Sequence, residues 1–460
     1  MLNRTYTLSE AQIIRRAATS LATREDLDPL MERIGDARFV LLGEATHGTS
    51  DFYFWRARLT QRLIQEKGFS FVAVEGDWPS CYTVNRYVKD YEGAGASARE
   101  VLYEFKRWPT WMWANWEVVA LVEWLRRHND DLKYLPTPTP PPKVGFYGLD
   151  VYSLWESLEE IIRYLKENSP EDLEAALRAY SCFQPYGEDV QAYAFATRFV
   201  PTSCENEVLN LLKEIRKRAQ ADTHEGDPEA AFNAEQNALA AVGAERYYRT
   251  MIRGDVESWN VRDRYMVDTL ERLVEHHGSS SKAIVWAHNT HIGDARATPM
   301  ARAGMVNVGQ LVRERRGHEG VVLVGFGTYR GTVIAAREWG GPMEKMPVFE
   351  ARSSSWEGRF HDALVADSLL ILPAGEEEST TASGNDVAES ASREFFRRNY
   401  GHRAIGVVYD PDTDRQGGYV PSSLSRRYDS FVHLETTHAL HPLHVVPETY
   451  EPPETYPWGV

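Results

Sequence analysis

Carboxylate and imidazole side chains follow several apolar segments of this sequence at short distances. Three apolar runs end in such groups: Glu44 and His47 after 39–42, Glu75 after 70–74, and His288 and His291 after 282–287. A histidine whose pKa lies near neutrality can take a proton from water, and that water can then attack an ester carbonyl. The pattern therefore indicates hydrolysis by an activated water molecule.

In this chemistry we expect His47 to be the general base. Glu44 or Glu75 would hold the tautomer of the imidazole and stabilise its protonated form. Arg56, which is always charged, would stabilise a developing oxyanion or anchor a carboxylate. His288 would protonate the leaving alcohol, and His291 lies close by in the sequence.

Two other interpretations use the same residues. Glu44, Glu75 and the histidines could bind a divalent metal that generates hydroxide, although Arg56 nearby argues against a tightly held cation. Alternatively, the protein could hold an apolar ligand without converting it. We favour the metal-independent hydrolase and expect no cofactor.

Several common catalytic motifs are absent from the sequence. There is no Gly-x-Ser-x-Gly elbow, no Walker-type loop, no Cys-x-x-Cys and no His-Glu-x-x-His. The glycines at 325 and 327 suggest a dinucleotide-binding turn, but a strand pattern follows them instead of a helix, so we reject that interpretation. The sequence therefore predicts catalysis without a serine nucleophile.

The apolar runs predict the strands that position these groups. Runs rich in branched side chains are typical of buried parallel strands, and ligands bind outside the carboxyl ends of such strands. A helix is predicted directly after the first run, at 52–64, which places Arg56 near its start. A third strand, 143–148, ends just before Asp150. We therefore expect these residues to share one edge of a sheet.

An aromatic cluster could bind the apolar part of a substrate. Trp108, Trp111 and Trp113 surround Pro109. They could line a pocket for a bulky ligand, or they could simply pack in the core. We predict substrate binding by these three residues together with Asp150.

The predicted fold class is α/β, with a mainly parallel β-sheet flanked by helices. We assign residues 1–153 and 278–460 to this core. Residues 154–277 show helical patterns without a convincing strand, which predicts an all-helical insertion forming a cap over the carboxyl ends of the strands. Later in the chain we expect a hairpin within 321–336 and an edge strand at 431–434.

Composition limits the partners. The chain has 460 residues and a formal charge of -16, with no basic cluster able to follow a phosphate backbone, so nucleic acid is not an expected partner. No apolar run could span a bilayer. Cys81, Cys182 and Cys204 are too few for a disulfide framework, which favours free thiols in a reducing compartment. We therefore predict a cytoplasmic protein acting on a small molecule.

Six segments of the sequence resemble the erythromycin esterase family. These are Gly43–Gly48, Glu75–Asp77, Phe146–Asp150, Ala234–Asn237, Trp259–Asp263 and Ala287–His291. The resemblance covers nearly the whole chain. It implies a hydrolase that opens a macrolactone ester without a serine nucleophile. It also implies His47 as the base, surrounded by Glu44, Arg56, Glu75, His288 and His291.

The sequence departs from the esterases that confer macrolide resistance. Those proteins have Phe after the first histidine and Glu three residues further on, where this chain has Gly48 and Asp51. It is more similar to the erythromycin esterase-like or succinoglycan-biosynthesis-like subgroup. We therefore expect hydrolysis of an ester or lactone, with a macrolide as the substrate that the resemblance implies. Iron-regulated ChaN-like and TIKI-like relatives keep the metal-dependent alternative open.

Overall fold

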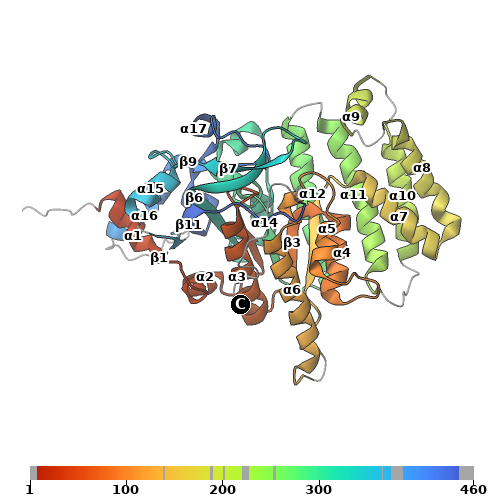
Figure 1. Cartoon of the computed structure of the whole chain (residues 1–460), viewed down its shortest axis with the longest axis horizontal. Helices are drawn as coiled ribbons and strands as arrows, with labels where there is room; N and C mark the ends of the chain where they lie inside the picture. The colour runs from red at the N-terminus through yellow and green to blue at the C-terminus, as the bar shows by residue number, and fades with distance from the viewer. Residues whose placement is uncertain are drawn as a thin grey trace, which may run out of the picture. The chain divides into compact units, whose positions relative to one another are not determined.

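The chain divides into two units, which we describe separately. The computed structural model describes residues 8–137, 140–186, 190–199, 203–219, 227–251, 255–364, 366–373 and 387–444 (Figure 1). The first unit comprises Met1–Phe69, Lys106–Leu121 and Lys282–Val460, of which only the described residues are discussed. The second comprises Ser70–Phe105 and Val122–Ser281.

A mostly parallel sheet forms the centre of the first unit. Its strands follow the order β1 (Ala18–Ser20), β8 (Ser368–Ile371), β11 (Ser430–Thr437), β6 (Val321–Ala336), β2 (Phe39–Leu42) and β5 (Ala283–Trp286). The pairs β11–β6, β6–β2 and β2–β5 are parallel, and β1–β8 and β8–β11 are antiparallel. Leu42 lies opposite Trp286 in the register, so β2 and β5 end at the same level.

Complete burial explains why β2 and β5 lack alternating polar residues. All residues of both strands are buried. A parallel strand covered on both faces needs apolar side chains at every position, and burying each large one contributes roughly 1.5–3 kcal/mol. The chain becomes polar only where these strands end.

Helices and a small sheet complete the first unit. The helices are α1 (Glu10–Ala17), α2 (Asp28–Ile34), α3 (Ser50–Lys67), α13 (Asn289–Ile292), α14 (Val308–Arg316), α15 (Trp356–Ala363), α16 (Val387–Phe396), α17 (Asp414–Gly417) and α18 (Leu424–Arg427). Strands β9 (Asn399–Arg403) and β10 (Tyr419–Ser423) pair antiparallel. Helix α6 (Trp116–Asp131) includes residues assigned to both units.

Two sequence predictions about this sheet are wrong. Residues 321–336 form one continuous strand, and the hairpin joins it to β7 (Met343–Val348). At Gly331 the pairing partner of β6 changes from β11 to β7. A Cβ atom at this position would lie 2.1 Å from the carbonyl oxygen of Thr437. The predicted edge strand is β11, which pairs on both sides and is therefore interior.

The second unit contains one parallel strand pair and the longest run of consecutive helices, α7 to α12. Strands β3 (Phe71–Asp77) and β4 (Gly145–Asp150) pair so that Asp77 lies opposite Asp150. The helices are α4 (Trp78–Lys89), α5 (Ala98–Tyr103), α7 (Leu154–Asn168), α8 (Leu173–Phe183), α9 (Val190–Phe199), α10 (Glu205–Ala219), α11 (Ala230–Met251) and α12 (Asp255–His277). Helices α7, α8, α9, α10 and α11 lie together in Figure 1, and their buried side chains share one apolar core.

The predicted α/β class with a mainly parallel sheet is confirmed. The described part of 154–277 is helical, as predicted, and contains no strand. The boundaries 1–153, 154–277 and 278–460, and the placement of the helices as a cap over strand ends, stay predictions.

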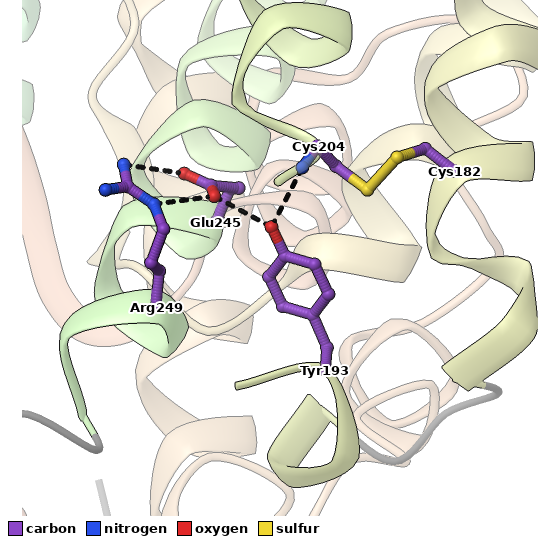
Figure 2. Close-up of a disulfide and its surroundings, with 5 residues drawn as sticks. All are labelled: Cys182, Tyr193, Cys204, Glu245 and Arg249. Atoms are coloured by element: carbon purple, nitrogen blue, oxygen red, sulfur yellow. Dashed lines mark hydrogen bonds and ion pairs between the residues drawn. A yellow bond between two sulfur atoms is a disulfide. The ribbon is translucent and has the colours of Figure 1, made fainter. Parts of the chain in front are cut away.

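The expectation of free thiols is wrong for two of the three cysteines. Cys182, near the end of α8, and Cys204, just before α10, form a disulfide (Figure 2). Cys81 is free and buried. The spacing of Cys182 and Cys204 does not reveal the pair, because the packing of α8 and α10 in one core brings them together. Since disulfides persist in oxidising compartments, the argument for a reducing compartment loses its basis.

None of the described helices is both long enough and apolar enough to cross a membrane.

Candidate active site

Glu44 and His47 lie in the loop that joins β2 to α3. His47 Nδ1 is 2.9 Å from Glu44 Oε1, and both residues are buried. The other carboxylate oxygen, Oε2, accepts a hydrogen bond of 2.5 Å from Arg56 Nη2. The first two turns of α3 bring Arg56 back to this loop, as the sequence predicts. Glu44 therefore connects an imidazole to a guanidinium.

Arg56 is enclosed by aromatic rings. Its guanidinium carbon lies 4.2 Å from the ring centroid of Tyr53 and 4.5 Å from that of Trp286. The residue is 0% exposed. Because a buried charge needs a counter-charge, removing one partner of such a pair typically costs 3–5 kcal/mol. These contacts indicate that Arg56 acts indirectly, by holding the carboxylate of Glu44.

Tyr53 also holds the backbone of this loop. Its hydroxyl group lies 3.2 Å from the carbonyl oxygen of His47 and 2.9 Å from that of Met112. The side chain thus links the His47 loop to the segment that contains the predicted tryptophans. A buried hydroxyl with two acceptors fixes the position of the backbone it contacts.

His288 follows β5 and begins α13. Its Nδ1 accepts a hydrogen bond of 3.2 Å from the backbone N–H of Thr290 and lies 2.8 Å from the Thr290 hydroxyl. The ring centroids of His47 and His288 are 4.9 Å apart, and the ring planes are inclined by 41°. The parallel register of β2 and β5 accounts for this proximity.

The hydrogen bonds give the two imidazoles different neutral tautomers. A carboxylate only accepts, so His47 carries its proton on Nδ1, towards Glu44, and Nε2 can accept a proton. His288 accepts at Nδ1 from a backbone N–H, so its proton is on Nε2. One ring can therefore act as a base while its neighbour offers a hydrogen-bond donor.

The next residues of α13 connect β5 to β2. The backbone N–H of Asn289 donates to the carbonyl oxygen of Glu44 at 2.9 Å. His291 lies in the same short helix, one turn after His288, and is buried. The segment therefore holds the ends of the two strands together.

Glu75 and Asp150 belong to the second unit, where both contact Arg262. Arg262 Nη2 lies 2.7 Å from Glu75 Oε1 and 2.7 Å from Asp150 Oδ2. Burial opposes the charge of Arg262, but the nearby Asp150, Tyr152 and Glu75 raise its pKa well above the usual value. The two predicted residues thus lie together around a cation that the sequence reasoning did not assign to the site.

The predicted aromatic residues differ in their exposure. Trp111 and Trp113 are buried, whereas Trp108 is only half-buried. Trp108 packs against Trp339, which is 62% exposed, with ring centroids 4.6 Å apart. Binding of substrate by the three tryptophans and by Asp150 stays a prediction.

The structure brings together the predicted residues that belong to the first unit. Glu44, His47, Arg56 and His288 form one cluster, and His291 follows in α13. Glu75 and Asp150 form another cluster in the second unit. In the described ranges, no group of three or more His, Cys, Asp or Glu side chains is arranged to hold a metal ion.

Sequence reasoning missed Tyr53, Arg262 and Asn289 as site residues. Arg262 lies in Trp259–Asp263 and Asn289 lies in Ala287–His291. Both segments resemble the family, so the resemblance could have pointed to both residues. Tyr53 offered no signal, because an aromatic residue in a buried helix is ordinary core material.

A mostly parallel sheet with histidines and a carboxylate at its strand ends is typical of α/β enzymes that bind substrates there. The family model for erythromycin esterase matches residues 64–437. The chain belongs to the erythromycin esterase family. The matched range includes Glu75, His288 and His291 and begins after Glu44, His47 and Arg56. Membership supports hydrolysis of an ester or lactone at the level of the family.

Individual relatives are distant. An erythromycin esterase type II from Escherichia coli is 23% identical over 328 residues, which cover 68% of this chain and 74% of that protein. The crystal structure of a succinoglycan biosynthesis protein has a TM-score of 0.72 and 21% identity, covering 94% of this chain and 97% of the other.

A mutant of the erythromycin esterase EreC, solved in its open conformation, has a TM-score of 0.60 and 16% identity. The similarity covers 91% of this chain and 95% of that one. These likenesses to solved structures show a shared fold.

Proposed function

We propose that this protein hydrolyses a carboxylic ester or lactone with water activated by His47. The observation that carries the proposal is the proximity of His47 and His288, whose ring centroids lie 4.9 Å apart and whose hydrogen-bond partners imply complementary tautomers. Nε2 of His47 takes a proton from water, and the water oxygen forms a bond to the carbonyl carbon. No serine nucleophile takes part.

Glu44 and Arg56 support this base. The carboxylate fixes the proton of His47 on Nδ1 and stabilises the imidazolium that forms when Nε2 is protonated. Arg56 holds the second carboxylate oxygen at 2.5 Å, so Glu44 keeps one orientation. The sequence predicts a direct contact of Arg56 with an anion, but its burial favours this indirect role.

His288 acts on the substrate oxygens. The sequence predicts that His288 protonates the leaving alcohol, but a neutral ring with its proton on Nε2 is better suited to donate a hydrogen bond to the oxygen on which negative charge develops. When the carbon–oxygen bond of the ester breaks, the proton held by His47 passes to the leaving alcohol. Within the first unit, His291 and the tryptophans at 108, 111 and 113 would complete the substrate site. The roles of Glu75 and Asp150 stay predictions.

The names of the relatives support a first candidate for the substrate class. Since the family and the Escherichia coli relative carry the name erythromycin esterase, a macrolide lactone is the first candidate. Activity on macrolides would make antibiotic resistance a possible role. Gly48 and Asp51, where macrolide-resistance esterases have Phe and Glu, favour a different small ester or lactone. A cytoplasmic location, with no nucleic-acid or membrane partner, stays a prediction.

The test is hydrolysis in ¹⁸O-labelled water. Simple lactones, acyl sugars and macrolides are incubated with the protein, and mass spectrometry follows the gain of one water. We expect the label in the carboxyl group of the product. His47→Gln should lower kcat/KM by at least about 100-fold, the smaller end of general-base effects. Full activity of this variant would overturn the proposal.

His361→Gln is the matched control. This histidine lies in α15 and pairs with Glu435, and its side chain is 39% exposed. We expect it to retain wild-type activity.

Dialysis against a chelator separates the metal-dependent alternative. Turnover that is unchanged in metal-depleted protein is the expected result. Loss of turnover that an added divalent ion restores would instead favour metal-generated hydroxide. Recovery of unchanged ligand from a tight complex would favour a binding protein.

A further inference from the structure

We propose that the buried pair of His402 and Glu357 positions the catalytic histidine segment through the side chain of Asn289. This inference rests on the proposed function, because it assigns positioning residues to the same site. None of the three residues is assigned a role by the sequence reasoning.

The pair is enclosed on all sides. His402 Nδ1 lies 2.6 Å from Glu357 Oε1, and both side chains are 0% exposed. The same carboxylate oxygen accepts a hydrogen bond of 2.9 Å from the backbone N–H of Arg403. Burying an imidazole and a carboxylate carries a desolvation penalty, which only good mutual geometry and further hydrogen bonds offset.

The other ring nitrogen of His402 faces Asn289. The Asn289 amide nitrogen lies 2.6 Å from the carbonyl oxygen of Phe326 and 3.2 Å from His402 Nε2. The amide has two protons, one for each acceptor. His402 Nε2 must therefore be unprotonated, which places the ring proton on Nδ1, towards Glu357.

This assignment agrees with the surroundings of the pair. The Tyr428 hydroxyl lies 3.2 Å from His402 Nε2, where it can donate as a second partner. Burial lowers the pKa of His402, although Glu357 acts in the opposite direction, and a lowered pKa favours the neutral ring. Protonation at Nε2 would place a donor against the amide of Asn289. Glu357 thus selects the tautomer that lets His402 hold Asn289.

Asn289 transmits this constraint to the site. Its backbone N–H donates to the carbonyl oxygen of Glu44 at 2.9 Å, and its carbonyl oxygen accepts from Arg427 Nη2 at 3.0 Å. It directly follows His288. A shift of the Asn289 side chain would therefore move His288 and the backbone of Glu44 together.

The first experiment compares variants of the acceptor. His402→Leu removes the acceptor for the Asn289 amide, while His402→Gln offers a side-chain oxygen in its place. We expect His402→Leu to lower kcat about 100-fold, since small displacements of catalytic groups have effects of this size, with KM changed less than about twofold. His402→Gln should recover at least about a tenth of wild-type kcat.

A double-mutant cycle tests whether Asn289 is the connection. Asn289→Ala alone should match His402→Leu, and the double variant should lose no more than either single one. Additive losses would overturn the proposal. His361→Leu provides the control. His361 lies in the same helix as Glu357 but pairs with Glu435 and is 39% exposed, so its effect should add to that of Asn289→Ala. Thermal unfolding confirms that each variant is folded.

NMR of ¹⁵N-labelled histidine gives a readout that does not depend on turnover. We expect the ring signals of His47 and His288 to report the two tautomers in the wild type and to broaden or shift in Asn289→Ala and His402→Leu. Unchanged signals would overturn the positioning role even if hydrolysis is found. Shifted signals in a protein that hydrolyses no ester would support the positioning role and count against the proposed function.

Discussion

A Cβ atom at Gly43 would lie 2.0 Å from the side-chain oxygen of Asn289. This oxygen is also placed to accept from the backbone N–H of Phe326 at 3.3 Å. Gly43 lies between the end of β2 and Glu44, and its own N–H donates to Val324. The absence of a side chain at Gly43 therefore lets Asn289 approach the backbone between β2 and Glu44.

Gly43→Ala should impair the site. The added methyl group must displace Asn289 or bend the chain before Glu44, which we expect to destabilise the fold by about 1–3 kcal/mol and to lower kcat about 100-fold. Urea unfolding and steady-state kinetics measure the two effects. Gly406→Ala is the control, because a Cβ there meets no atom within 4 Å. Wild-type kcat in Gly43→Ala would contradict the role of this close approach.

Tyr53→Phe tests the anchoring of the His47 loop. The variant keeps the ring that stacks on Arg56 but removes the hydroxyl that faces His47 and Met112. Leaving buried acceptors without a partner should cost about 1–3 kcal/mol in the free energy of unfolding. We also expect a large fall in kcat and only a small change in KM.

Tyr400→Phe is a suitable comparison for this variant. The Tyr400 hydroxyl lies 3.4 Å from Glu10, at the limit of a hydrogen bond, and also interacts with Arg398, and the side chains of both partners are exposed. Its unfolding free energy should stay within about 0.5 kcal/mol of wild type. Equal stability of both variants would show that the Tyr53 hydroxyl does not hold the loop.

The arrangement of β2 and β5 could be predicted because its signals are local. Continuous apolar runs predict buried parallel strands, and the change to Glu44 and to His288 marks where each strand ends. Parallel strands in register then bring these ends to the same level. The α/β class and the proximity of His47 to His288 both follow from that pattern.

Contacts between segments far apart in the sequence could not be predicted in this way. Glu357 and His402 are separated by 45 residues, and no local periodicity relates them. The interior position of β11 depends on which strands pair with it, and its apolar pattern is equally compatible with an edge. The Cys182–Cys204 disulfide depends in the same way on helix packing. In each case tertiary packing supplies information that local pattern lacks.

His277 should make the protein less stable in acid. Burial, with a further contribution from Lys89, lowers its pKa to about 3, while its Nε2 lies 3.0 Å from the Tyr147 hydroxyl. Between this value and the ordinary 6.5, the unfolded chain binds a proton that the folded chain excludes, so stability falls as the pH falls. At pH 5 the loss amounts to about 2 kcal/mol.

The measurement is the free energy of unfolding in urea at pH 7 and pH 5. His277→Gln can still hydrogen bond to Tyr147 but cannot titrate, so it should lose about 2 kcal/mol less than wild type over this interval. His361→Gln should lose as much as wild type. An identical loss in His277→Gln would show that other groups account for the acid sensitivity.

The disulfide should stabilise the helical part of the second unit. Cys182 and Cys204 are 22 residues apart, and closing a loop of this size contributes about 3 kcal/mol by restricting the unfolded chain. The backbone N–H of Cys204 also donates to the Tyr193 hydroxyl, which in turn donates to Glu245, as Figure 2 shows. The bond therefore fixes one end of a hydrogen-bonded chain between α9 and α11.

Thiol labelling in denaturant measures the bond directly. Of the three cysteines, only Cys81 should react before reduction, and all three after it. A reductant should lower the unfolding free energy of the wild type and of Cys81→Ala, but should leave Cys182→Ala/Cys204→Ala unchanged, because that variant has no bond to break. Three reactive thiols in unreduced protein would mean that the two helices fold without this covalent link.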